Sequence, residues 1–139
     1  MYILKTEYHF DAAHFLAGYN GKCSNLHGHR WKVELEVKSE TLQESGQERQ
    51  MVYDFSTVKK TLKKICDHFD HCFIYEKGSL SENFEKELEL ANFRTVKING
   101  RPTTENLARI IFEMLENDGI KPYSVTVYET PENYAKYVK

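Results

Sequence analysis

The chain has 139 residues, about the length of one domain and enough to bury a hydrophobic core. Hydrophobic residues make up 40% and charged residues 29%, which excludes a disordered chain, and a net charge of -2 gives no basic footprint for nucleic acid. No apolar run reaches the roughly 18 residues of a membrane span, and residues 1–7 predict a strand rather than a signal peptide. We therefore expect one domain, residues 1–139, in the reducing cytoplasm, with three free cysteines.

The N-terminal part predicts a pair of antiparallel strands. Between residues 31 and 38, apolar and charged residues alternate without a break, which is typical of a strand with one buried face. That face would carry Trp31, Val33, Leu35 and Val37. Residues 2–10 match the pattern more weakly, and a loop over 15–26 that contains glycine and asparagine would join the two strands.

Two histidines separated by one glycine, His27-Gly28-His29, lead into the second strand. Residues two apart on a strand point to the same face, so both rings can approach one point. His14 follows the neighbouring strand, about 4.8 Å away, and can supply a third ring nitrogen. Imidazoles suit zinc best among common metals, so we expect a zinc site. Cys23 would either close the site as a fourth ligand or stay a free thiol for chemistry, and the spacing leaves both interpretations open.

A loop and a helix are predicted after the strand pair. The polar stretch 41–50 predicts the tip of a hairpin. Asp54 is placed to cap a helix over 55–69, because apolar residues recur there at helical spacing. Cys66 lies beside that apolar stripe, and we expect it to fill the core.

The acidic segment 76–93 carries only a weak signal. Ser79 and Glu82 could form the capping box of a short helix within it. A short strand is then predicted over 94–99.

The last part of the chain predicts a second amphipathic helix and a final strand. Residues 102–105 would open the helix and residues 117–119 would end it, and the strand would run over 123–130. The order of elements predicts an α+β fold, with a four-stranded antiparallel sheet and two helices packed on one face.

Three further polar residues occupy unusual positions. Glu129 ends an apolar row on the final strand, so it lies either at the wet rim of the sheet or at a ligand. Asp70 directly precedes His71, and an aspartate can orient an imidazole and support its charged form. Adjacent Asp-His pairs are also common by chance, so the pair alone does not establish a site.

Taken together, several motifs resemble the 6-pyruvoyltetrahydropterin synthase family, and most closely its 6-carboxytetrahydropterin synthase branch. The resemblance covers nearly the whole chain. The three-residue gap between Cys23 and His27 favours the carboxy branch. Ile74 and Tyr75 depart from the family pattern, and the segment 76–93 is longer than usual. The motifs are residues 10–14, 23–29, 54–55, 69–71, 102–105 and 129–130.

The resemblance implies a T-fold, in which sheets of several subunits close a barrel and active sites fall between chains. It implies a homohexamer built as a dimer of trimers, in which His71 would serve Cys23 of another subunit. Pairing between subunits would also cover the exposed sheet edges.

The resemblance further implies a zinc lyase that converts 7,8-dihydroneopterin triphosphate into 6-carboxy-5,6,7,8-tetrahydropterin, acetaldehyde and triphosphate, on the route to 7-deazaguanines such as queuosine. Zinc would act as a Lewis acid and Cys23 as the proton carrier, supported by Asp70 and His71. A carboxylate offers two acceptors for the neighbouring N–H groups of a pterin ring. The implied metal ligands are His14, His27 and His29, and the implied pterin contacts are Glu129, Thr103, Thr104 and Glu105. The resemblance also places Glu129 among the catalytic residues, in the proton relay with Cys23, Asp70 and His71.

Two other functions stay open at this point. The same fold could make the pyruvoyl product, which differs in the bond that breaks. The chain could also be a zinc- or pterin-binding module without turnover, with Cys23 as the fourth ligand.

Overall fold

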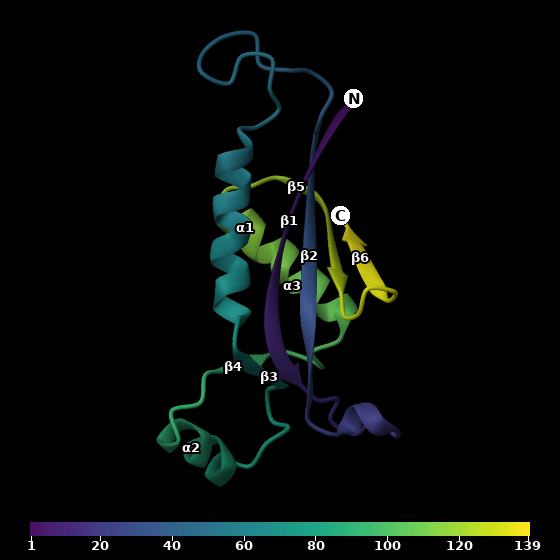
Figure 1. Cartoon of the computed structure of the whole chain (residues 1–139), viewed down its shortest axis with the longest axis vertical. Coiled ribbons are helices and arrows are strands. Elements are labelled where there is room, and N and C mark those ends of the chain that lie inside the picture. The colour runs from purple at the N-terminus through teal and green to yellow at the C-terminus, as the bar shows by residue number, and fades with distance from the viewer.

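The computed structural model describes all 139 residues and contains a six-stranded sheet with three α-helices. Figure 1 shows that the two longest strands run side by side for most of the length of the molecule. The strands are β1 (Tyr2–His14), β2 (His27–Ser39), β3 (Cys72–Glu76), β4 (Thr95–Ile98), β5 (Pro122–Tyr128) and β6 (Tyr134–Val138). The helices are α1 (Phe55–Phe69), α2 (Glu82–Leu90), α3 (Thr104–Asn117) and a 3-10 turn over Lys22–Ser24.

The sheet is mixed, with the strand order β4-β3-β1-β2-β5-β6. β1 pairs with β2 along its whole length in antiparallel fashion, and β2–β5 and β5–β6 are also antiparallel. β3 joins β1 in parallel, and β4 joins β3 in parallel. The α+β class is confirmed, whereas the expectation of a four-stranded, wholly antiparallel sheet is wrong. The difference arises because β3 and β6 are short strands without the alternation that marks β2.

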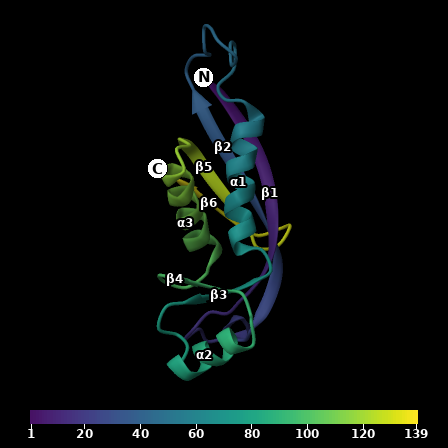
Figure 2. The same cartoon turned by 90° about the vertical axis from the view of Figure 1, so that its left-hand side faces the viewer.

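The α1 and α3 helices pack on the same face of the sheet and bury the hydrophobic core between the layers (Figure 2). The face of β2 that was predicted from alternation is the buried one, since Trp31 and Val33 are 0% exposed. From the helices, Leu62 and Leu115 are likewise fully buried. The alternating pattern therefore sets which face of β2 meets the helices, and hence which side chains share that face further along the strand.

Side-chain caps explain where the helices begin. Asp54 accepts a hydrogen bond from the Ser56 amide at the start of α1, as predicted. Thr103 caps α3 in the same way. The remaining helix, α2, is capped by Ser81 and not by the expected Ser79, because the Ser81 hydroxyl accepts a hydrogen bond from the Phe84 amide.

Two boundaries differ from the expectations in a way that affects the site. The strand β1 runs to His14 instead of residue 10, and β2 begins at His27 instead of residue 31, so the two histidines at the strand ends are paired with each other. The final long strand, β5, ends at Tyr128, which places Glu129 just after it. The 41–50 segment is a loop between β2 and α1, so the expectation that it forms the tip of a hairpin is wrong. No helix has the length and apolar character needed to cross a membrane.

Candidate metal and pterin site

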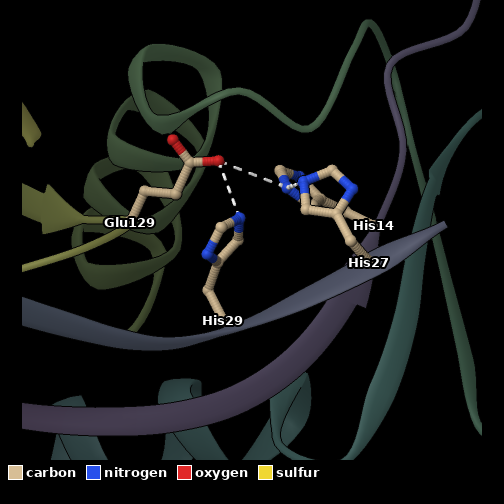
Figure 3. A group of neighbouring side chains, drawn as sticks. All are labelled: His14, His27, His29 and Glu129. Atoms are coloured by element: carbon tan, nitrogen blue, oxygen red, sulfur yellow. Dashed lines mark hydrogen bonds and ion pairs between the residues drawn. The ribbon is translucent and has the colours of Figure 1, made fainter. Parts of the chain in front are cut away.

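Three imidazoles meet where β1 ends and β2 begins, on the face that carries the core. His14 and His27 are direct cross-strand partners, and His29 faces Ala12 two residues further along. Alternation puts His27 and His29 on the same face as buried Trp31. The Nε2 atoms of His14 and His27 are 3.0 Å apart, and Figure 3 shows the rings turned toward one another. The local hairpin alone therefore brings the three rings together.

Backbone carbonyls hold two of these rings. The Nδ1 atom of His14 lies 2.8 Å from the Pro102 carbonyl oxygen, and Nδ1 of His27 lies 2.7 Å from that of Asn25. A carbonyl only accepts, so each Nδ1 carries the proton and each Nε2 presents a lone pair. Two lone pairs 3.0 Å apart repel each other unless a cation or a proton lies between them. Such outer contacts are typical of histidines that bind metal.

Glu129 brings a carboxylate to the same point. Its Oε1 atom is 2.9 Å from Nε2 of His29 and 3.4 Å from Nε2 of His14 (Figure 3). The four donor atoms of His14, His27, His29 and Glu129 all lie within 4.8 Å of one another, so this group could bind a metal ion. Nε2 of His29 is buried and makes no hydrogen bond despite its short distance to the carboxylate. Three imidazoles and a carboxylate that converge on one point are a ligand set that fits a bound cation.

Burial favours the neutral form of these histidines. Loss of solvent lowers the pKa of His14 and of His29, and this effect outweighs the attraction of Glu129. Trp31 forms the apolar wall of the site, with its ring centroid 4.9 Å from that of His14 and 5.3 Å from that of His29. Neutral imidazoles are the form that binds metal, so the environment prepares the rings for an ion.

Cys23 lies in the 3-10 turn that precedes β2, and its side chain is half-buried. It does not belong to the group of converging donor atoms, in which the fourth member is Glu129. The turn is tied to the end of β1 because the Leu16 amide donates to the Cys23 carbonyl at 2.8 Å. The structure therefore keeps Cys23 near the hairpin end without making it a donor of the group.

The other two cysteines are buried in the fold. Burial raises the pKa of the Cys66 thiol to about 12 and also raises that of Cys72. Cys66 is 0% exposed and belongs to the core, as predicted.

Asp70 and His71 form a hydrogen-bonded pair at the turn between α1 and β3. Nδ1 of His71 is 2.8 Å from Oδ2 of Asp70, whose Oδ1 accepts from the Asp11 amide at 2.9 Å. That backbone hydrogen bond is the main reason why the pKa of Asp70 is lowered. The ring of His71 is 77% exposed and lies in a depression beside Asp11 and Arg30, which alternate with Ala12 and His29 and so face away from the helices.

The start of α3 lies against the histidine group. Thr103 uses its hydroxyl oxygen to cap the Asn106 amide, and Thr104 donates to Glu105 at 3.1 Å. Pro102, directly before them, supplies the carbonyl that holds His14. The contributions of Pro102 and Asn25 could not be predicted from sequence, because they act through backbone carbonyls, which every residue type carries.

Comparisons with known proteins agree with the family resemblance found in the sequence motifs. A family model described as 6-pyruvoyl tetrahydropterin synthase matches residues 3–139. A Haemophilus influenzae protein named 6-carboxy-5,6,7,8-tetrahydropterin synthase is 39% identical over 140 residues, covering 99% of both chains. One of the same name from Synechocystis is 34% identical, covering 99% of this chain and 93% of its own.

Two solved structures agree with the fold. The Caenorhabditis elegans 6-pyruvoyl tetrahydropterin synthase is 28% identical with a TM-score of 0.64, covering 100% of this chain and 97% of its own. An uncharacterized protein from Wolinella succinogenes has a TM-score of 0.77 over 99% of this chain and 97% of its own, and at 24% identity it supports the fold alone.

Proposed function

The chain belongs to the 6-pyruvoyl tetrahydropterin synthase family, adopts its T-fold and is a lyase of the 6-carboxytetrahydropterin synthase type, and from this we propose its reaction. The substrates are 7,8-dihydroneopterin triphosphate and one water molecule, and the products are 6-carboxy-5,6,7,8-tetrahydropterin, acetaldehyde and triphosphate. The reaction would serve 7-deazaguanine synthesis, such as that of queuosine, in the cytoplasm, where three free cysteines suit the reducing conditions. The whole chain, residues 1–139, would act as one catalytic domain.

The group of converging donors carries this proposal. His14, His27 and His29 would hold a zinc ion through Nε2, because two of the rings already donate their Nδ1 protons to carbonyls. When bound, zinc supplies Lewis-acid polarisation of an oxygen on the substrate side chain, which acidifies the neighbouring C–H bond. The buried tryptophan behind the rings keeps water away from that side of the site.

Cys23 would move the proton in this reaction. As a thiolate it would take a proton from the acidified carbon and return it later. Asp70 would hold the ring of His71 through Nδ1 and favour its charged form, which in turn stabilises the thiolate. The exposed ring of His71 is open to a partner from outside the chain, and by analogy with the family we propose that this partner is Cys23 of another subunit.

Glu129 would anchor the pterin ring. Its carboxylate lies at the donor group, and one carboxylate can accept from two neighbouring N–H groups of a pterin. It has a second possible use as the fourth zinc ligand, since Oε1 is 2.9 Å from Nε2 of His29. Thr103, Thr104 and Glu105 at the start of α3 are further candidates for the pterin contact.

An assembly of six chains, a dimer of trimers, completes the proposal. β1 is paired on its second side only over Ala12–His14, so most of that edge is free. At the opposite side of the sheet, β6 is also an edge strand. Free edges of this length are normally covered, and pairing between subunits would cover both.

Incubation of the zinc-loaded protein with 7,8-dihydroneopterin triphosphate, followed by mass spectrometry, tests the reaction. We expect acetaldehyde and the 6-carboxy product. A pyruvoyl product without acetaldehyde would assign the chain to the other branch of the family. Binding of the substrate without any turnover would instead leave a zinc- or pterin-binding module and overturn the proposed reaction.

A further inference from the structure

We propose that Asn106 is a positioning residue that holds the turn of residues 99–103 in the one conformation that orients both His14 and the Cys23 loop. The inference deepens the proposed function and rests on it for the roles of His14 and Cys23. It is carried by a chain of hydrogen bonds that joins two candidate groups through a single side-chain amide.

Every polar atom of the Asn106 amide is used. Its Nδ2 donates to the carbonyl of Asn99 at 2.9 Å and to that of Arg101 at 3.0 Å. Its Oδ1 accepts from a guanidinium nitrogen of Arg109 at 2.8 Å, one turn along α3. Only a neutral amide offers two donors and one acceptor in this arrangement. The half-buried side chain therefore holds two carbonyls of the turn from the first part of α3.

Gly100, between the two bonded carbonyls, shows how closely the amide approaches. Its φ is +80°, a backbone conformation that glycine adopts without strain. A Cβ atom at this position would lie 3.1 Å from Nδ2 of Asn106. The turn is thus shaped around the amide group, and a side chain at residue 100 would push against it.

The turn first determines the orientation of the His14 ring. Pro102 follows the held residues directly and is buried, and its carbonyl oxygen lies 2.8 Å from Nδ1 of His14. If the turn relaxes, this carbonyl moves away and the ring loses its fixed tautomer and direction. Loss of such an outer contact typically weakens metal binding about 10- to 100-fold.

The turn also determines the position of the loop that contains Cys23. The side chain of Arg101 leaves the same turn and donates from Nε to the Ala17 carbonyl at 2.9 Å. Ala17 belongs to the loop whose ends are tied by the bond from the Leu16 amide to the Cys23 carbonyl. A single turn, held by Asn106, therefore contacts the histidine group on one side and the cysteine loop on the other.

The variant Asn106→Asp tests the proposal with little change in shape. The carboxylate would keep the bond to Arg109 but lose both donors toward the carbonyls. Added negative charge near a cation site should strengthen zinc binding, so weaker binding is the signature of lost positioning. We expect zinc affinity, measured by chelator competition, to fall about 10- to 100-fold. We also expect alkylation of Cys23 by iodoacetamide to quicken several-fold.

Two further variants separate the effect on His14 from the effect on the Cys23 loop. Arg101→Met removes only the bond to the Ala17 carbonyl, so Cys23 alkylation should quicken while zinc affinity stays at the wild-type value. Gly100→Ala reaches the amide from the other side and should reproduce both effects of Asn106→Asp. A core variant in α1, Val58→Ala, serves as the stability control, because it lowers the melting temperature far from the turn and should leave both readouts unchanged.

The outcomes are distinct from those for the proposed function. Wild-type zinc affinity in both Asn106→Asp and Gly100→Ala would overturn the link to His14, and wild-type alkylation rates would overturn the link to Cys23. Effects that merely follow melting temperature, as Val58→Ala would reveal, would reduce Asn106 to a structural residue. The alkylation measurement needs no metal. It therefore tests the link between Asn106 and the Cys23 loop even if the wild-type chain does not bind zinc and the proposed function is wrong.

Discussion

Strands β1, β2 and β5 carry polar side chains on both faces of the sheet, but only on one face do these side chains find partners of opposite charge. On the face away from the helices, each carboxylate has a cationic partner. Glu36 accepts from Lys136 and from the hydroxyl of Ser124, and Glu34 accepts from Lys5. These groups satisfy one another within the chain, so the polar face needs no ligand to explain its charges.

At the end of the helix-facing side, no cation balances the polar groups. His14, His27, His29 and Glu129 converge there, and burial lowers the pKa of His14 and of His29, which favours their neutral form. The contrast shows which clusters of titratable residues indicate a binding site. A cluster whose charges pair internally supports the fold, whereas a cluster of donors that lacks a cation indicates a place for one.

The largest effect expected from this comparison is loss of the metal. Either His27→Ala or His29→Ala should reduce zinc from about one ion per chain to almost none, because two remaining imidazoles bind too weakly. Metal analysis of the purified protein measures this. The exposed ring of His68 lies outside the group, so His68→Ala should keep its zinc. Full zinc occupancy in both ligand variants would remove the three-histidine assignment.

The next largest effect is on turnover alone. Cys23→Ala should lower kcat about 100- to 10,000-fold, which is the usual contribution of a group that transfers protons. Zinc content and melting temperature should stay unchanged, because Cys23 is not among the converging donors. The buried thiols provide the controls, and Cys66→Ala and Cys72→Ala should matter little for kcat. Loss of zinc from Cys23→Ala would show that the thiol is a ligand.

A smaller effect is expected for the pterin contact. Glu129→Gln keeps the shape of the side chain but turns one acceptor toward the ligand into a donor. A mismatched polar pair in a closed site costs about 1–3 kcal/mol, so affinity for sepiapterin or biopterin should fall at least several-fold in a titration. Equal affinities would remove Glu129 from the pterin contact. A fall in zinc affinity instead would identify the carboxylate as the fourth ligand.

The smallest effect concerns the polar face and its pH dependence. Hydrogen bonds from Lys136 and then Ser124 lower the pKa of Glu36, so the unfolded chain takes up this proton at a higher pH than the folded chain does. The stabilisation is therefore present above the ordinary pKa of about 4.5 and is lost as the pH falls through the lowered pKa.

Replacing this carboxylate tests the internal pairing. Glu36→Gln should cost at most about 1 kcal/mol at pH 7, since the pair is partly exposed. It should also flatten the loss of stability at acid pH, measured by urea unfolding of the metal-free protein. Zinc affinity should not change. Unfolding curves that run parallel to wild type from pH 7 to acid would contradict the role given to Glu36.

The parts of this molecule that sequence patterns predicted are those governed by local periodicity. The alternation in β2 set its buried face, and from that face it followed that His27 and His29 point the same way. The helix start at Asp54 also followed from residue type and spacing. In α2, by contrast, Ser79 and Ser81 are both plausible caps, and only the bond to the Phe84 amide selects the second.

Other features depend on partners that are distant in sequence. A buried parallel strand such as β3 shows a continuous apolar run, which does not by itself distinguish a strand from a helix. β6 is recognisable only through its pairing with β5. The contact from Pro102 to His14 joins residues 88 positions apart through a backbone carbonyl, and no pattern of side chains announces it.

The β1–β2 hairpin also has a consequence for how the protein is made. All three imidazoles belong to residues 14–29, whereas Glu129 and Pro102 come from segments synthesised much later. Chains fold from the N-terminus during synthesis, so we expect the hairpin to capture zinc before β5 and α3 exist. The ion would then act as a nucleus onto which later segments fold. Refolding should accordingly be slower with a chelator present, and equal rates with and without zinc would exclude this order of events.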